Sequence, residues 1–235
     1  MKALIFDCDG VLVDTESDGH RVAFNRAFAA RGLEAEWSVA RYGELLHTAG
    51  GKERMCRHFD ECGWPPGATD RNTLIQELHR LKTDLFMKIV EHGELPLRPG
   101  VARLVDEARA GGVTLAICST SNERAVNTIV EKLLGPERKA AFALILAGDV
   151  VSHKKPDSEI YDLAARRLGV APQACVVIED SRNGLLAAKA AGMRCVITTN
   201  DYTVGEGFAE ADGVFSTLGD PPDCCVTLAF LRRLT

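Results

Sequence analysis

Two carboxylates lie two residues apart directly after a short apolar run near the start of this chain. Asp7 and Asp9 follow residues 3–6, which are typical of a buried strand, and Gly10 begins a loop. If the strand continues through residue 9, both side chains point to one face, where they repel unless a cation lies between them. Mg²⁺ prefers oxygen ligands and substrate phosphate. The pattern predicts a metal-bound phosphate site with an aspartate nucleophile, with a solvated acidic turn as the alternative.

A run of hydroxyl and amide side chains stands at a predicted junction between a strand and a helix. It follows the apolar residues 113–118 and consists of Ser119, Thr120, Ser121 and Asn122. Hydroxyls and backbone N–H groups at the start of a helix form anion sites. The same residue types are ordinary helix N-caps, so the run alone leaves both interpretations open.

Two charged motifs lie at the ends of other predicted elements. Lys155 comes just before a helix, within residues 154–157, and an ammonium group there suits phosphate, although a solvated turn is the alternative. Glu179 and Asp180 end the apolar strand pattern that begins at Cys175. This acidic pair is suited to completing the Mg²⁺ shell.

The elements that must position these residues alternate between strands and helices. Apolar runs that predict buried strands cover residues 4–6, 113–118, 144–147, 175–178, 195–198 and 214–215. Helical spacing covers residues 101–110, 123–134, 158–168 and 183–191. The alternation predicts an α/β fold with a doubly wound parallel sheet. Asp7, Ser119 and Asp180 would then meet at the carboxyl ends of the strands, where such sheets bind ligands.

The segment 16–95 breaks this alternation and carries helical spacing, with helices expected at 52–62 and 71–92. We therefore predict an inserted small all-helical cap subdomain over 16–95. It would divide the core into residues 1–15 and 96–235, with hinges near 14–17 and 93–97.

Composition excludes several classes of function. The net charge of −5 argues against nucleic acid as a partner. No apolar run is long enough to span a membrane, and Met1-Lys2 leads directly into a strand, so we expect no membrane partner and no secretory signal. Eight cysteines without a C-x-x-C pair predict free thiols in a reducing compartment.

In this order, the four motifs resemble the haloacid dehalogenase superfamily of phosphohydrolases over the whole chain. The motifs are D-x-D-G-V, the hydroxyl run, K-P and E-D-S-x-x-G at 179–184. The helical insert is similar to the small cap of the phosphoglucomutase-like branch. The segments that resemble the CbbY-type xylulose-1,5-bisphosphate phosphatases of plants and algae are 7–16, 42–46, 50–55, 63–65, 97–101, 119–123 and 134–138. Ser158 and Arg182-Asn183 depart from the family pattern, which affects only local loop shape.

The resemblance implies a phosphoaspartyl mechanism that needs Mg²⁺. Asp7 would attack phosphorus, and Asp9 would protonate the leaving alkoxide and later accept a proton from water. Asp7, the backbone carbonyl of Asp9, and Asp180 would hold the metal, with Glu179 in support.

The remaining core motifs would bind the transferring phosphoryl group. Ser119, Thr120 and Lys155 would neutralise its charge, which is usually the largest contribution to such catalysis. Ser121 and Asn122 would complete the substrate-binding loop.

Substrate choice would be determined by the helical insert. Gly50-Gly51 precedes a helix whose first turn carries Lys52 and Arg54, which predicts a second anion site for the phosphate that does not react. A solvated helix face is the alternative. The residues expected to contact the sugar and this distal phosphate are Glu16, His20, Tyr42 and Arg54.

The family resemblance further implies a role that composition and spacing do not indicate. The substrate would be xylulose 1,5-bisphosphate, an inhibitory misfire product of Rubisco, and its removal would protect carbon fixation. We expect a monomer that is linked to Rubisco only through this inhibitor. It would work in the chloroplast stroma, with a transit peptide absent from this chain, or otherwise in the cytoplasm. A β-phosphoglucomutase-like mutase is the nearest alternative, and an inactive binding module of the same fold is the alternative from another class.

Overall fold

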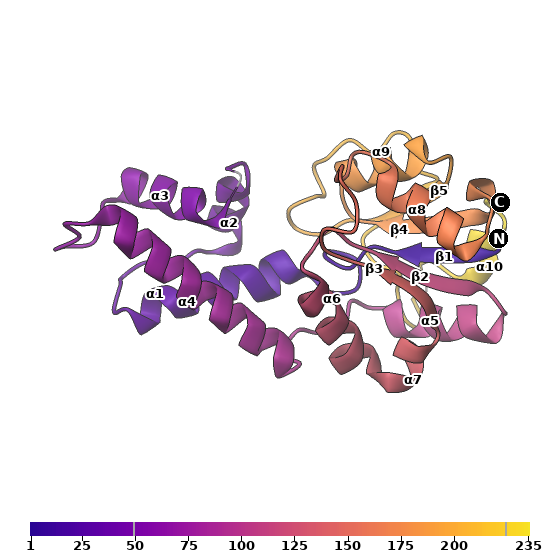
Figure 1. The fold of residues 1–235 in the computed structure, drawn as a ribbon, viewed down its shortest axis with the longest axis horizontal. Coiled ribbons are helices and arrows are strands. Elements are labelled where there is room, and N and C mark those ends of the chain that lie inside the picture. The colour runs from indigo at the N-terminus through magenta and orange to yellow at the C-terminus, as the bar shows by residue number, and fades with distance from the viewer. Residues whose placement is uncertain (49, 224) are drawn as a thin grey trace. The chain divides into compact units, whose positions relative to one another are not determined.

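The computed structural model describes two compact units of this chain (Figure 1). The core unit comprises Met1–Asp14 and Leu95–Thr235, and the helical unit comprises Thr15–Glu94. The described residues are 1–48, 50–223 and 225–235.

The core unit is built on one six-stranded sheet in the order β3-β2-β1-β4-β5-β6. Every neighbouring pair of strands is parallel. The strands are β1 (Ala3–Phe6), β2 (Thr114–Cys118), β3 (Phe142–Leu146), β4 (Cys175–Glu179), β5 (Arg194–Thr198) and β6 (Gly213–Phe215). This arrangement confirms the predicted doubly wound α/β fold, and the buried central strands explain why their sequences lack alternation.

Helices cover both faces of this sheet. The helices of the core unit are α5 (Val101–Ala110), α6 (Glu123–Ile129), α7 (Gly135–Ala140), α8 (Glu159–Leu168), α9 (Arg182–Ala190) and α10 (Leu228–Arg232). In Figure 1, α8 and α9 lie on one face, and α5 and α7 lie on the other. Ala3 and Ile5 of β1 share a buried cluster with Ile160 of α8 and Leu185 of α9. Strand alternation directs the residues between them to the opposite face.

Some local features differ from the sequence pattern. The helix expected over 123–134 ends as an α-helix at Ile129 and continues as a π-helical turn, Val130–Leu134. A short 3₁₀ turn, Pro172–Ala174, precedes β4. Among the described cysteines all are free, as predicted, and Cys224 lies outside the described residues. No helix in the described part of the chain is both long and apolar enough to cross a membrane.

The helical unit packs around a cluster of aromatic rings. It contains a π-helical segment, Thr15–Arg21, followed by α1 (Val22–Ala30), α2 (Val39–Leu46), α3 (Gly51–Cys62) and α4 (Arg71–Glu91). Trp37 lies 4.6 Å from Phe24, 5.1 Å from Phe28 and 5.7 Å from Tyr42, measured between ring centroids. The loop that carries Trp37 is fixed by its backbone N–H, which donates to Asn25 Oδ1 at 2.8 Å. This apolar centre accounts for the helical spacing in the sequence.

Candidate active site

The carboxyl ends of β2, β1 and β4 bring three of the predicted site residues to one edge of the sheet. Asp7 follows β1, Ser119 follows β2 and Asp180 follows β4. Two backbone bonds extend the ladder past the strand ends: Asp7 N–H donates to Ile178 O at 3.0 Å, and Ser119 N–H donates to Leu146 O at 2.9 Å. Because the strand order reverses between β1 and β4, this edge is the switch point where open α/β sheets bind ligands.

Lys155 is the cation closest to the predicted nucleophile. Its Nζ donates to Asp7 Oδ1 at 2.6 Å, to Glu179 Oε1 at 2.5 Å and to Cys118 O at 3.1 Å. Burial acts to lower the pKa of Lys155, but the carboxylates of Asp7 and Glu179 outweigh it and raise that pKa. Burial raises the pKa of Asp7 from 3.8 to about 8, with Lys155 opposing the shift. The lysine predicted to face phosphate thus lies against the predicted nucleophile.

Three carboxylates converge beside this lysine. Asp7, Glu179 and Asp180 each offer one oxygen, and these oxygens all lie within 4.8 Å of one another. Burial raises the pKa of Asp180 well above its usual value, and the charges of Glu179 and Asp7 add to the shift. Since one ammonium group does not balance three converging carboxylates, two of them buried, the group fits a divalent cation. Its donors are all oxygen atoms, which suit a hard ion such as Mg²⁺, Ca²⁺ or Mn²⁺.

Two residues from other loops determine the position of Asp180, one by a hydrogen bond and one by leaving space. Asn200 Nδ2 donates to Asp180 Oδ2 at 2.9 Å. Gly10 has a φ of +74°, and a Cβ there would lie 1.9 Å from Asp180 Oδ2, so glycine is required at this approach. Sequence reasoning treated Gly10 only as the start of a loop and missed Asn200. The available signal was the position of Asn200, just past a strand of the same sheet.

Asp9 is positioned by a loop and not by the strand. β1 ends at Phe6, so the condition under which both carboxylates would point to one face of a strand is not met. A tight turn follows, in which Gly10 N–H donates to Val13 O at 2.7 Å. Asp9 Oδ2 accepts hydrogen bonds from the Ser121 hydroxyl and, at 3.5 Å, from the Ser119 hydroxyl. Its side chain is therefore directed at the hydroxyl run, and it is not one of the three converging carboxylates.

The hydroxyl run divides into two parts. Ser119 is buried and its Oγ accepts from Ser121 N–H at 3.1 Å, while Thr120 is half-buried beside them. Asn122 is exposed, and its Oδ1 accepts from Ala125 N–H at 3.2 Å at the start of α6. The helix-cap interpretation thus describes Asn122, whereas the two serines face the Asp9 carboxylate.

Three of the predicted substrate contacts form a hydrogen-bonded group within the helical unit. The Tyr42 hydroxyl donates to Glu16 Oε2 at 2.6 Å. Arg54 Nη1 donates to the Tyr42 oxygen at 3.2 Å and lies 4.0 Å from Glu16 Oε2. Arg54 Nε donates to Thr48 O at 3.0 Å, which fixes the guanidinium. The group joins a carboxylate, a phenol and a guanidinium, which can contact both hydroxyls and phosphate.

The fourth predicted contact, His20, pairs with a residue that sequence reasoning missed. Lys82 Nζ lies 3.0 Å from His20 Nδ1 and above the rings of Phe24 at 4.8 Å and Phe86 at 5.4 Å. Burial lowers the pKa of His20 well below its usual value, with the charges of Lys82 and Arg54 adding to the shift. The imidazole is therefore neutral and accepts from the ammonium group. Burial also lowers the pKa of Lys82 to about 8.

A signal for Lys82 was present in the sequence of α4. The buried face of this helix carries Ile75, Leu78, Lys82, Phe86 and Ile89, which repeat every three or four residues. A lysine in an apolar stripe requires a partner or a ligand, because a buried charge without one is strongly unfavourable. The His20 imidazole is the partner that the fold supplies.

The turn that precedes α3 carries a carboxylate as well as the predicted cations. Gly50 has a φ of +93°, and a Cβ there would lie 2.0 Å from Glu53 Oε2, so the Glu53 carboxylate lies over this turn. Gly51 begins the helix. Lys52 is exposed, whereas Arg54 is partly buried, and two positions on a helix are about 200° apart. Arg54, and not Lys52, is therefore the cation of this turn that contacts Tyr42 in the hydrogen-bonded group described above.

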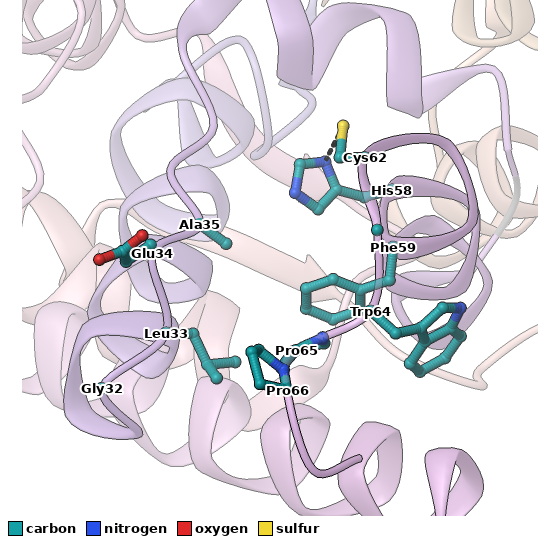
Figure 2. Close-up of a pocket in the computed structure, with 11 residues that line it drawn as sticks. Gly32, Leu33, Glu34, Ala35, His58, Phe59, Cys62, Trp64, Pro65 and Pro66 are labelled. Atoms are coloured by element: carbon teal, nitrogen blue, oxygen red, sulfur yellow. Dashed lines mark hydrogen bonds between the residues drawn. The ribbon is translucent and has the colours of Figure 1, made fainter. Parts of the chain in front are cut away.

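A separate cavity of ≈ 440 Å³ in the helical unit is lined by none of the predicted site residues (Figure 2). Its walls include Leu33, Phe59 and Trp64, and the Cys62 sulfur lies 3.8 Å from His58 Nδ1. Burial lowers the pKa of His58, with Arg41 adding to the shift. Because the described lining residues include neither lysine nor arginine, this cavity does not suit a sugar bisphosphate.

Comparison with known proteins places this geometry in context. The family model for haloacid dehalogenase-like hydrolases matches residues 1–192. The chain is 57% identical over 237 residues to the CBBY-like protein of Arabidopsis thaliana, covering 99% of this chain and 74% of that protein. It is 44% identical to the protein CbbY of Rhodobacter capsulatus, covering 90% of this chain and 91% of that protein.

A solved structure extends the similarity to three dimensions. The crystal structure of a mutant CbbY from Rhodobacter sphaeroides in complex with xylulose-(1,5)bisphosphate superposes with a TM-score of 0.76 at 40% sequence identity. The match covers 98% of this chain and 99% of the other.

Proposed function

This chain belongs to the haloacid dehalogenase-like hydrolases and is a sugar phosphatase, and on that premise we propose that it removes the 1-phosphate of xylulose 1,5-bisphosphate. The products would be xylulose 5-phosphate and inorganic phosphate. The observation that carries the proposal is the buried Asp7–Lys155 pair beside two further carboxylates, at the ligand-binding edge of the sheet. The complex of the Rhodobacter sphaeroides CbbY with this bisphosphate supports the choice of substrate.

We assign the reaction to Asp7 and Asp9. A carboxylate oxygen of Asp7 attacks phosphorus, the bond from phosphorus to the sugar oxygen breaks, and Asp9 gives its proton to that oxygen. Asp9 then accepts a proton from water, whose oxygen attacks the phosphoaspartate, releasing inorganic phosphate and restoring both carboxyl groups. Splitting the reaction into two displacements is the advantage of covalent catalysis. The hydrogen bonds from Ser119 and Ser121 to Asp9 support this role, because they fix its carboxyl group.

We propose that Mg²⁺ is the cofactor. The carboxylates of Asp7, Asp180 and Glu179 and the backbone carbonyl of Asp9 would hold it, which extends the predicted set by a direct contribution from Glu179. The cation would supply positive charge that keeps Asp7 ionised and offsets the charge of the phosphoryl group. Lys155 adds a fixed ammonium to the same side of the nucleophile. Thr120 would add its hydroxyl, and Asn122 would fix the start of α6.

We assign the helical unit to substrate selection, as the cap over residues 16–95, and residues 1–15 and 96–235 to the hydrolytic core. Arg54, which contacts Tyr42, and Lys82, which contacts His20, would bind the phosphate that is not cleaved. Neutral His20, Glu16 and Tyr42 would contact sugar hydroxyls. Lys52, Gly50 and Gly51 would give a weaker outer contact, because Glu53 already lies at that turn.

The proposal includes a physiological role. Removing xylulose 1,5-bisphosphate would protect Rubisco from an inhibitory misfire product, through the inhibitor and not through a protein contact. Similarity to an Arabidopsis thaliana protein over 99% of this chain supports the chloroplast stroma as the compartment. We propose that the enzyme works there as a monomer.

A panel of sugar mono- and bisphosphates tests the function. We expect inorganic phosphate to accumulate fastest from xylulose 1,5-bisphosphate, and chelation by EDTA to abolish release until Mg²⁺ is restored. Interconversion of sugar monophosphates without net phosphate release would replace the proposal with a mutase. Full activity after exhaustive chelation would remove the metal from it.

A further inference from the structure

Tyr161 carries a hydroxyl group that packing alone does not require. The residue lies on the inner face of α8, fully buried beside Ile160 and Ala164. Its ring centroid is 5.1 Å from Lys155 Nζ, a cation–π contact that a phenylalanine would preserve. Its hydroxyl donates a hydrogen bond to Glu179 Oε1. The hydroxyl therefore serves Glu179 and not the apolar core.

Glu179 is enclosed on several sides at the end of β4. Oε1 accepts from both Tyr161 and Lys155 Nζ, and Oε2 accepts from Asp180 N–H at 3.2 Å. Gly184 of α9 leaves room for this carboxylate, since a Cβ there would lie within 2.2 Å of both of its oxygens. These contacts fix one orientation of a carboxylate that contributes to the three-carboxylate group.

We propose that Tyr161 is a positioning residue for the cation site, which holds the Glu179 carboxylate in the orientation that faces Asp7 and Asp180. The inference rests on the proposed function, in which a divalent cation binds these carboxylates. Lys155 contacts both Asp7 and Glu179, two of the three carboxylates that would hold the cation. The Tyr161 hydroxyl and the Lys155 ammonium donate to the same oxygen, Oε1, so the carboxylate is held from two segments of the core.

The test is the affinity for Mg²⁺, measured by calorimetry on the whole protein without substrate. Because residues that hydrogen-bond a metal ligand typically change metal affinity by roughly 10- to 100-fold, Tyr161→Phe should weaken Mg²⁺ binding by about that factor. Saturating Mg²⁺ should restore phosphate release by this variant. Ser158→Ala is the matched control, because it removes a hydroxyl that donates to Asp162 at the start of the same helix. This control should bind Mg²⁺ as the wild type does.

A double-mutant cycle separates positioning from a general effect on the fold. In a Glu179→Gln background, Tyr161→Phe should have no further effect on Mg²⁺ affinity, because the group that it positions has changed. An equal loss in both backgrounds, or unchanged Mg²⁺ affinity in Tyr161→Phe alone, would overturn the role of Tyr161. Wild-type protein that releases phosphate without binding a cation would instead overturn the proposed metal dependence.

Discussion

The core unit and the helical unit each contain a cluster of charged side chains, but the two clusters have opposite imbalances of charge. In the core unit, Lys155 is the ammonium group that faces the three converging carboxylates, with Asp9 nearby. In the described part of the helical unit, Arg54 lies 4.0 Å from the Glu16 carboxylate, and Lys82 lies beside the neutral imidazole of His20. The first cluster is short of positive charge, and the second is short of negative charge.

The difference suits two separate tasks, phosphoryl transfer in the core cluster and substrate selection in the helical cluster. A cluster rich in buried carboxylates binds a cation and supplies a nucleophile, whereas a cluster rich in cations binds the anionic part of a substrate. Changes in the core cluster should therefore lower turnover of every phosphate ester, whether or not it carries a second phosphate. Changes in the helical cluster should discriminate between a bisphosphate and a small monoester.

The largest expected effect comes from Asp7→Asn, which removes the proposed nucleophile while preserving its shape. Loss of a nucleophile that acts as part of a unit typically lowers turnover by about 10⁴-fold or more, and we expect this for all substrates. Phosphate release from purified variant, with circular dichroism to verify folding, is the measurement. Asp106→Asn is the control, because Asp106 bonds Arg138 at the surface of the same unit. Substantial turnover by Asp7→Asn would remove the nucleophile assignment.

Asp9→Asn should have the next largest effect. General acid–base catalysis contributes about 10²- to 10⁴-fold, so kcat should fall by that range for a sugar bisphosphate and for p-nitrophenyl phosphate. The loss should be smaller for p-nitrophenyl phosphate, because its leaving group needs less protonation. Retention of more than about a tenth of wild-type kcat on the sugar would contradict the role of Asp9.

Arg54→Ala should alter selectivity and leave the core chemistry intact. A charge-assisted hydrogen bond is worth roughly 1.5–3 kcal/mol, so kcat/KM for xylulose 1,5-bisphosphate should fall by about 10- to 150-fold. The value for p-nitrophenyl phosphate should change little. Lys52→Ala is the comparison within the same helix turn, and it should have a smaller effect because Lys52 is exposed. If the ratio of the two substrates stays constant in both variants, α3 is only a solvated helix face.

Lys82→Met should stabilise the protein while weakening bisphosphate binding. Burial lowers the pKa of Lys82 from 10.5 to about 8. A shift of that size corresponds to at most about 3 kcal/mol, so the variant should be more stable by up to that amount at pH 7. The groups that face Lys82 are Glu16, Arg54 and the neutral His20. Above pH 8 the folded wild type loses the Lys82 proton while the unfolded chain keeps it, so the free energy of unfolding rises with pH. The advantage of the variant should therefore shrink at pH 9.

Urea unfolding at pH 7 and pH 9 measures this pH dependence. Lys88→Met on the exposed face of α4 is the control and should show no such dependence. A destabilised Lys82→Met at pH 7 would mean that the contact with His20 outweighs the penalty for burying the charge. KM of the wild type for the bisphosphate should rise above pH 8, because Lys82 then loses its proton.

The best-predicted feature was the convergence of residues at the carboxyl ends of the parallel strands. Asp7, Ser119 and Asp180 each follow an apolar run, and strands that run in one direction must end at one edge. The sheet, its helices and the core motifs could therefore be placed from local patterns.

The contacts that the sequence did not predict join residues that are far apart in the chain. Lys82 and His20 are 62 positions apart, and the apolar stripe of α4 does not name its partner. Tyr161 lies within the helix predicted over 158–168, and the acceptor of its hydroxyl, Glu179, is on the strand β4. The sequence also did not indicate that the Glu53 carboxylate lies beside Gly50, next to the anion site predicted at α3. Tertiary packing decides each of these contacts.

The stoichiometry of phosphate release tests the central claim most directly. If the core unit cleaves one phosphate while the helical unit binds the other, exhaustive reaction with xylulose 1,5-bisphosphate should yield one equivalent of inorganic phosphate and one of xylulose 5-phosphate. Phosphate assay together with product identification by NMR measures both. Two equivalents would show that the remaining phosphate is not protected, and none would show that this chain does not hydrolyse the bisphosphate.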